Sequence, residues 1–250
     1  VEQIYWRLSD KNLSTCEFDD QSIDAKDFRI FGNGFKLEAV TFNNNKHVKY
    51  LPFSIEKFSP NIVEFSASNS SLVLINNKNF AGLKHLRSLN LANNNIKFID
   101  PDAFDDLTSL EELDLSGNEL ETIDEELFSK LKNLKVLRLG SNKMHAMPRT
   151  LLRSMRNLID FSMSHQYISK IDENIFKTNM KLKNIYMNSN KLKSISPNMF
   201  NNLKALEYVD VRENKCIDSF YDQSVFTTMK NEILAKCGAG YELKLGKKAQ

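Results

Sequence analysis

A motif of eleven positions returns every 24 residues through most of this 250-residue chain. From Leu86 to Ile96 it reads Leu-x-x-Leu-x-Leu-x-x-Asn-x-Ile, where x is any residue. The same frame starts again at Leu110, Leu134, Leu158, Leu182 and Leu206, and earlier at Ile62, at Leu37 after one inserted residue, and more weakly at Leu13. A fixed period of this length is typical of solenoids, in which each repeat packs on its neighbours. The chain is therefore predicted to fold as a stack of coils.

Each repeat is predicted to hold one short strand, because Leu-x-Leu places both leucines on one face and the middle residue on the other. A single such strand buries little apolar surface. Parallel strands stacked about 4.8 Å apart merge the leucine rows into one core, in which each buried leucine contributes about 2 kcal/mol. Nine strands of this kind would form a sheet roughly 40 Å long.

The asparagine after each strand is predicted to close the turn. Its amide carries two donors and an acceptor, so a column of such residues can satisfy backbone groups that lack ladder partners. The column consists of Asn45, Asn94, Asn118, Asn142, Asn190 and Asn214. Gln21, Ser70 and Gln166 replace asparagine in the other repeats, and we expect looser or water-assisted turns there.

The second half of each repeat carries an apolar residue and, five positions later, usually a phenylalanine, as in Ile99 and Phe104. Short helical or 3₁₀ turns are predicted on this side, because Ser196-Pro197 and Asp100-Pro101 look like an N-cap followed by proline at the first helical position. Asp124 and Asp172 are predicted to cap similar turns. Since the phenylalanine side is wider than the strand side, the stack should curve into a horseshoe with the sheet on the concave face.

These features resemble the leucine-rich repeat family over about residues 13–214. The resemblance implies an α/β solenoid with a parallel concave sheet, a capping strand in residues 1–12, a helical cap in 215–237 and a tail in 238–250. The segments Cys16-Glu-Phe-Asp-Asp-Gln-Ser-Ile, Leu51-Pro-Phe and Glu213-Asn-Lys-Cys-Ile-Asp are further similar to secreted insect members, including those of mosquito complement-like immunity. This likeness implies a secreted, non-catalytic recognition protein of innate immunity that binds a protein ligand or co-receptor.

Caps are expected at both ends of the stack, because an end coil exposes unpaired backbone and apolar surface. Ile4, Trp6 and Leu8 alternate as a capping strand would. At the other end Cys216 and Cys237 are interpreted as a disulfide that holds a helix over the last repeat, contributing about 3 kcal/mol. Two reduced core thiols are the alternative. The apolar face of this helix is predicted to contain Phe220, Val225, Phe226, Met229, Ile233 and Cys237.

The third cysteine, Cys16, stands at an inward position of the first repeat and is interpreted either as a small buried hydrophobe or, as in paired-cysteine caps of extracellular relatives, as the partner of an upstream cysteine. A capping disulfide implies an oxidising, extracellular location. Asn12-Leu-Ser and Asn69-Ser-Ser are glycosylation sequons that agree with secretion, and a sugar on Asn69 would cover part of the concave rim.

No arrangement of residues predicts catalysis, a metal site or a cofactor. The four histidines lie in different repeats without ligand spacing, and neither a phosphate-binding loop nor a nucleophile elbow is present. Carboxylates on the strand face line an open surface instead of a closing cleft. A net charge of +2 without interleaved aromatic residues argues against nucleic-acid binding, and no segment is apolar enough to span a membrane.

An open, curved sheet is suited to binding, and its exposed residues occupy positions three, five, seven and eight of each repeat. In the fourth and fifth repeats these residues are mostly small, whereas tyrosine and arginine, which dominate interface hot spots, appear from the sixth repeat onward. The predicted partner-binding residues are Arg138, Asp160, His165, Tyr186, Tyr208 and Arg212. The alternative is that these are ordinary surface residues and that the partner binds elsewhere.

A second candidate site is basic and lies in the sixth repeat and the loops beside it. Its residues are Lys132, Lys135, Lys143, Arg149, Arg153 and Arg156. Such a cluster can bind sulfated glycans, and the alternative is an ordinary solvated convex face. Three classes of function therefore remain: a secreted recognition protein, the ectodomain of a single-span receptor or adhesion protein, and a glycan-binding or inhibitory module.

Overall fold

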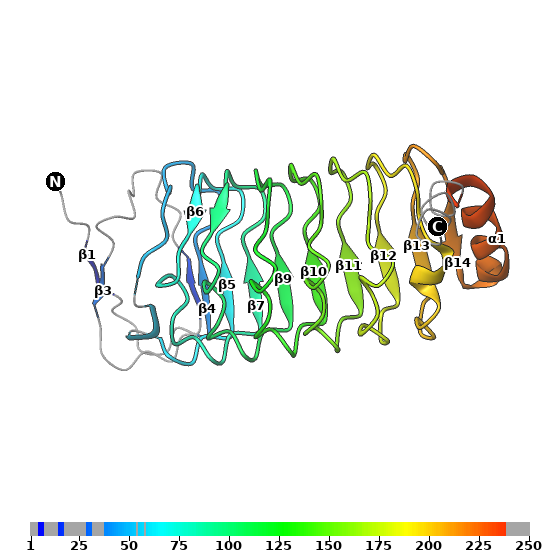
Figure 1. Cartoon of the computed structure of the whole chain (residues 1–250). Helices are drawn as coiled ribbons and strands as arrows, with labels where there is room; N and C mark the ends of the chain where they lie inside the picture. The colour runs from blue at the N-terminus through cyan, green and yellow to red at the C-terminus, as the bar shows by residue number, and fades with distance from the viewer. Residues whose placement is uncertain are drawn as a thin grey trace, which may run out of the picture.

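The computed structural model describes residues 5–7, 15–17, 29–31, 38–53, 55–57 and 59–238. Its coils stack side by side in one row (Figure 1). Each coil contributes one three-residue strand to a ten-stranded sheet, in the order β14-β13-β12-β11-β10-β9-β7-β5-β4-β2. Nine of these strands run parallel and β14 runs antiparallel to β13. The predicted solenoid with a parallel sheet is confirmed.

The parallel strands lie where the Leu-x-Leu segments predict them. They are β2 (Thr15–Glu17), β4 (Ala39–Thr41), β5 (Glu64–Ser66), β7 (Ser88–Asn90), β9 (Glu112–Asp114), β10 (Val136–Arg138), β11 (Asp160–Ser162), β12 (Asn184–Tyr186) and β13 (Tyr208–Asp210). Equivalent residues of neighbouring coils face each other in register, as Leu113 and Leu137 do. From β4 onward the middle residue of every strand is buried and its two neighbours form the concave face, except that Asp210 is also buried.

Two small sheets accompany the main one. β6 (Leu74–Ile75) pairs in parallel with β8 (Phe98–Ile99) on the convex side, one coil apart. β1 (Tyr5–Arg7) lies within the predicted capping segment, but it pairs with β3 (Arg29–Phe31) in a separate two-stranded sheet. Ile4 and Leu8 lie outside the described residues.

The convex side is filled by phenylalanine. Phe80, Phe104 and Phe128 occupy the same position in successive coils, and their ring centroids lie 6.1 and 6.2 Å apart. The core forms one continuous cluster along the stack instead of one cluster per coil. Because each coil buries its apolar face only against its neighbours, the coils stabilise one another.

The asparagine column satisfies the turns as predicted. The Asn118 amide nitrogen donates to the carbonyls of Leu91 (2.9 Å) in the preceding coil and Leu115 (3.0 Å) in its own, and its oxygen accepts from the amide of Ile96 (3.1 Å). Asn118 therefore joins adjacent coils, as do Asn94 and Asn214. Asn142 and Asn190 repeat the pattern.

The expectation of loose turns at the substituted positions is wrong for the two that are described. Gln166 donates to the carbonyl of Leu139 and accepts from the amide of Met144 (3.0 Å), so its longer side chain makes the same two cross-coil bonds. The Ser70 hydroxyl lies 2.9 Å from the carbonyl oxygen of Phe42 and accepts from the amide of Asn45 (3.2 Å). Gln21 lies outside the described residues.

The predicted caps on the convex side form with one exception. Ser196 accepts from the amide of Asn198 at the start of the 3₁₀ helix η3 (Pro197–Phe200), and Asp124 and Asp172 accept from the amide two residues later at 2.9 Å. Asp100 instead accepts from the amide of Asn77 (3.0 Å) in the preceding coil, so it ties two coils together. A further 3₁₀ turn, η2, spans Ile55–Lys57.

The residue after each strand turn has a left-handed backbone. Gly117 adopts a φ of 67°, and the equivalent residues of other coils adopt φ of 54° to 62° although none of them is glycine. These residues are Asn44, Asn69, Asn93, Ser141, His165, Ser189 and Glu213. Asparagine tolerates this region, whereas serine, histidine and glutamate adopt it at a cost that the stack must offset.

The C-terminal cap combines a strand, a short turn and a helix. β14 (Phe220–Asp222) covers the edge of β13, and η4 (Gln223–Val225) leads into α1 (Phe226–Cys237), at the red end of Figure 1. Cys237 forms a disulfide with Cys216, with their Cα atoms 5.1 Å apart. Met229, Ile233 and Cys237 are buried as predicted. The assignment of Phe220 and Val225 to the buried helix face is wrong, because both precede the helix and are exposed.

Candidate recognition surface

Three aromatic side chains form a row across the concave face at its C-terminal end. The ring centroids of Tyr186 on β12 and Tyr208 on β13 lie 5.4 Å apart, and those of Tyr208 and Phe220 on β14 lie 6.1 Å apart. The strand register makes the two tyrosines diagonal neighbours, because Tyr186 faces Asp210 whereas Tyr208 faces Asn184. We call Tyr186, Tyr208 and Phe220 the aromatic row.

Arg212 lies beside this row in a fixed orientation. Its Nε and Nη2 donate to the two carboxylate oxygens of Asp210 at 3.0 and 2.6 Å, and its guanidinium carbon lies 5.3 Å from the ring centre of Phe220. The hydrogen bond to Asp210 and the charge of its carboxylate raise the pKa of Arg212 above the ordinary arginine value. Burial and the same carboxylate raise the pKa of Tyr208 above the ordinary tyrosine value. The arrangement therefore presents aromatic rings and a paired guanidinium without an isolated charge.

Phe220 is the member of the row that the sequence did not predict. Its side chain is 52% exposed, whereas the neighbouring Tyr221 is buried. The alternation of exposed Phe220, buried Tyr221 and exposed Asp222 is the pattern of a half-buried strand and was the available signal. Because β14 reverses the strand direction, the 24-residue frame does not extend to it.

A shallow hollow of about 380 Å³ adjoins the aromatic row at Tyr186. Arg138 on β10 and Asp160 on β11 line it together with Tyr186. The side-chain amide nitrogen of Asn184 donates to the Asp160 carboxylate, and Arg138 is exposed. Four of the predicted residues, Arg138, Asp160, Tyr186 and Tyr208, therefore lie along one continuous path over the strands β10 to β13.

His165 lies elsewhere on this face. It occupies the left-handed turn position after β11, with a φ of 54°, and its side chain is exposed but does not line the hollow. Asn69 occupies the equivalent turn after β5 and is also exposed, so its position is compatible with a sugar. Asn12 lies outside the described residues.

The structure divides the predicted basic cluster. Lys135 pairs with Glu111 (2.6 Å), Lys143 with Glu119 (2.8 Å) and Arg149 with Asp172 (3.0 Å). Lys135 precedes β10 and Lys143 follows it, so the two lie at opposite ends of that strand. Lys132, Arg153 and Arg156 are exposed and make no ion pair within the described part of the chain. The six residues therefore do not form one unpaired cationic surface.

The acidic partners of these lysines belong to a segment of opposite charge. Residues 98–129 contain twelve Asp and Glu and neither Lys nor Arg, whereas residues 130–159 contain eight Lys and Arg and neither Asp nor Glu. We call these the acidic segment and the basic segment. Their shared boundary is bridged by Glu111–Lys135 and Glu119–Lys143, and the hydrogen bonds from the two lysines lower the pKa of both glutamates.

Among the described residues, no group of three or more His, Cys, Asp or Glu side chains is placed to hold a metal ion. None of the helices in that part of the chain has the length and apolar character of a membrane-spanning helix.

Comparison with known proteins identifies the repeat. A leucine-rich repeat family model matches residues 60–120, and a model described as a BspA-type leucine-rich repeat region of six copies matches residues 97–231, more than half of the chain. No curated protein sequence matches the chain.

Solved structures share the fold. A chain of the glycosylated Toll–Spätzle complex of Drosophila matches with 20% identity and a TM-score of 0.51, over 82% of this chain and 34% of that chain. A chain of the TLR13–ssRNA13 complex matches with 19% identity and a TM-score of 0.47, over 74% and 33%. The chain thus spans about a third of the length of each of these structures, and the match to the Toll–Spätzle chain shows the fold alone.

Proposed function

Because the chain belongs to the leucine-rich repeat family, we propose that it is a non-enzymatic recognition module that binds a protein through its concave face. The fold supports this class of function, since solenoid proteins of this kind use extended concave surfaces for binding. The binding residues we assign are the aromatic row together with Arg138, Asp160 and Arg212, with His165 at the rim.

The observation that carries the proposal is the aromatic row, in which Phe220 is exposed and both tyrosines are half-buried. Aromatic side chains bury large areas at little entropic cost, and with arginine they are enriched at interface hot spots. The concave face of the fourth and fifth repeats offers only small or acidic residues at the equivalent positions, such as Ser88, Asn90, Glu112 and Asp114. Binding energy should therefore be concentrated at the C-terminal end of the sheet.

We place this module outside the cell, with sugars on Asn12 and Asn69. The disulfide between Cys216 and Cys237 supports this location, because disulfides persist in oxidising compartments. We also extend an immune role to the chain as part of the proposal. The Toll–Spätzle complex is described as a hub in Drosophila development and innate immunity, and this chain shares its fold.

The test is capture of protein partners from native extracellular fluid on immobilised chain. Tyr186→Ala/Tyr208→Ala should lose the specifically captured protein, while Ser88→Ala/Asn90→Ala, a matched pair on the same face, should retain it. Affinity of the purified partner for each variant, measured by surface plasmon resonance, should fall at least tenfold only for the tyrosine pair. Equal affinity for both variants would place the binding site elsewhere.

A further inference from the structure

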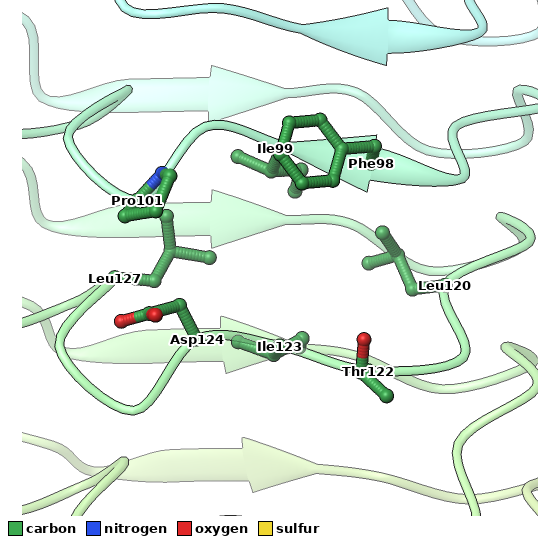
Figure 2. Close-up of a pocket in the computed structure, with 8 residues that line it drawn as sticks. All are labelled: Phe98, Ile99, Pro101, Leu120, Thr122, Ile123, Asp124 and Leu127. Carbon is green, nitrogen blue, oxygen red and sulfur yellow. The ribbon is translucent and has the colours of Figure 1, made fainter.

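A second hollow lies on the convex side of the coil, away from the aromatic row. Its volume is about 230 Å³, and its apolar lining consists of Phe98, Ile99, Pro101, Leu120, Ile123 and Leu127. Figure 2 shows Phe98 and Ile99 on β8, Pro101 on the loop that follows β8, and the other three side chains on the next coil, with Thr122 and Asp124 beside them. We call this feature the convex hollow.

At the convex hollow, two backbone hydrogen bonds that join the preceding pair of coils are missing among the described residues. The amide of Lys97 donates to the carbonyl of Val73 (3.1 Å), and that of Asp100 donates to the carbonyl of Ile75 (2.9 Å). Within residues 59–238, no equivalent backbone bond joins Glu121 to Lys97 or Asp124 to Ile99. No strand of the next coil pairs with β8 among the described residues, so the sheet ends at β8. The outer edge of β8 faces the hollow.

The stack does not cover the apolar side chains of the hollow completely. Ile99 and Ile123 are 7% and 8% exposed and Met147, at the same position in the next coil, is 9% exposed, whereas Ile75 and Ile195 are fully buried. Phe98 is 58% exposed beside them. An aliphatic side chain entering the hollow would therefore cover apolar surface that the stack itself leaves open.

The rim of the convex hollow is negatively charged. It lies in the acidic segment, and Glu121, Asp124, Glu125 and Glu126 are all exposed around the loop that forms one wall. None of these four carboxylates takes part in an ion pair among the described residues. Glu125 and Glu126 also line a neighbouring hollow with Arg153, so Glu121 and Asp124 are the carboxylates assigned to the site. Apolar side chains beside these two carboxylates are complementary to lysine or arginine flanking an aliphatic residue.

We propose that the convex hollow binds an extended cationic peptide segment of a partner protein. One aliphatic side chain of the segment enters between β8 and the 120–127 loop, and its flanking cations lie against Asp124 and Glu121. Binding along an open strand edge, with alternate side chains entering a pocket, is an established mode of peptide recognition. The site is separate from the aromatic row, so the two can act independently.

The probe is a fluorescein-labelled peptide, Lys-Lys-Val-Leu-Lys-Lys, titrated with the full chain at 0.15 M NaCl and followed by fluorescence anisotropy. Phe98→Ser should raise the Kd at least tenfold, and Glu121→Lys/Asp124→Lys should do the same. Met180→Ser, which changes another exposed side chain outside the hollow, should leave the Kd unchanged. Circular dichroism checks that each variant is folded. The substituted side chains are exposed, so the variants are expected to fold.

Two control peptides separate this site from general attraction between charges. The peptide Lys-Lys-Ser-Ser-Lys-Lys should bind at least tenfold more weakly, and Glu-Glu-Val-Leu-Glu-Glu should not bind. Equal affinity for the serine peptide, or an unchanged Kd in Phe98→Ser, would overturn the proposal. The Tyr186→Ala/Tyr208→Ala variant should bind the probe normally, so failure here is distinguishable from failure of the concave site.

Discussion

The acidic and basic segments are neighbours with the same backbone and opposite surfaces. β9 and β10 pair in register, and Asn118 and Asn142 make equivalent bonds to the coils before them. The charges differ completely, with twelve carboxylates in one segment and eight cations in the next. The repeat therefore determines the core and the turns of a coil, while the outward positions vary independently and give each coil its own surface.

The largest effects should come from the feature that both segments share. Asn118→Ala and Asn142→Ala each leave a buried amide and buried carbonyls without their partners, so each should lower the free energy of unfolding by about 3 kcal/mol. Urea titration followed by circular dichroism measures both. Because the bonds do not depend on surface charge, a difference of more than about 1.5 kcal/mol between the two would contradict the equivalence of the coils.

The next effect distinguishes the two turns. A Cβ added to Gly117 would clash with Oδ1 of Asn93 and lie 3.2 Å from its Cα, at a φ of 67°. Gly117→Ala should therefore lower the free energy of unfolding by about 2 kcal/mol, since strain and contact add. Thermal unfolding should show a lower midpoint for Gly117→Ala than for Ser116→Ala, the adjacent control.

The corresponding change in the basic segment should have the opposite sign. Ser141 adopts a φ of 54°, a conformation that its Cβ disfavours and that glycine adopts freely. Ser141→Gly removes the left-handed strain but adds entropy to the unfolded chain, so a net gain of about 0.5 kcal/mol is expected. Loss of stability in the same urea titration would show that the serine makes a compensating contribution.

The smallest effect concerns the charged boundary. The pKa values of Glu111 and Glu119 are lowered chiefly by hydrogen bonds from Lys135 and Lys143. The two pairs therefore stabilise the fold at pH values above the ordinary glutamate pKa, and this stabilisation is lost as the pH falls through the lowered pKa values. Glu111→Gln/Glu119→Gln should weaken the fall in melting temperature below about pH 4.3. These groups are exposed, so the change should be slight and should shrink further in 0.5 M NaCl. An identical pH profile in wild type and variant would show that the boundary pairs do not contribute to stability.

The positions of the strands could be predicted because burial repeats with the coil. Leu89, Leu113 and Leu137 each occupy the middle of a strand, and the sequence frame alone assigns them to the core. Bonds between coils were harder to predict, because they join residues more than twenty positions apart and depend on side-chain length and rotamer. Asp100 and Gln166 show this, since both bond to the preceding coil in ways that the local sequence does not reveal.

The candidate site follows the same division. Tyr186 and Tyr208 fall in the outward columns of adjacent strands, so their proximity could be predicted from the period. Phe220 could not be placed in this way, because the chain reverses direction after the last repeat and a new register begins. The convex hollow lies where no backbone bond in the described part of the chain joins Glu121 to Lys97, and no residue pattern marks this position.

The reversed strand at the C-terminal cap also limits assembly. Head-to-tail polymerisation of a solenoid requires one molecule to offer an edge that continues the coil of the next. Here β14 presents an edge of opposite polarity, and α1, fastened by its cystine to the last coil, lies against it. A second copy could not continue the parallel sheet at this edge. The cap therefore also opposes the growth of a fibre from stacked copies.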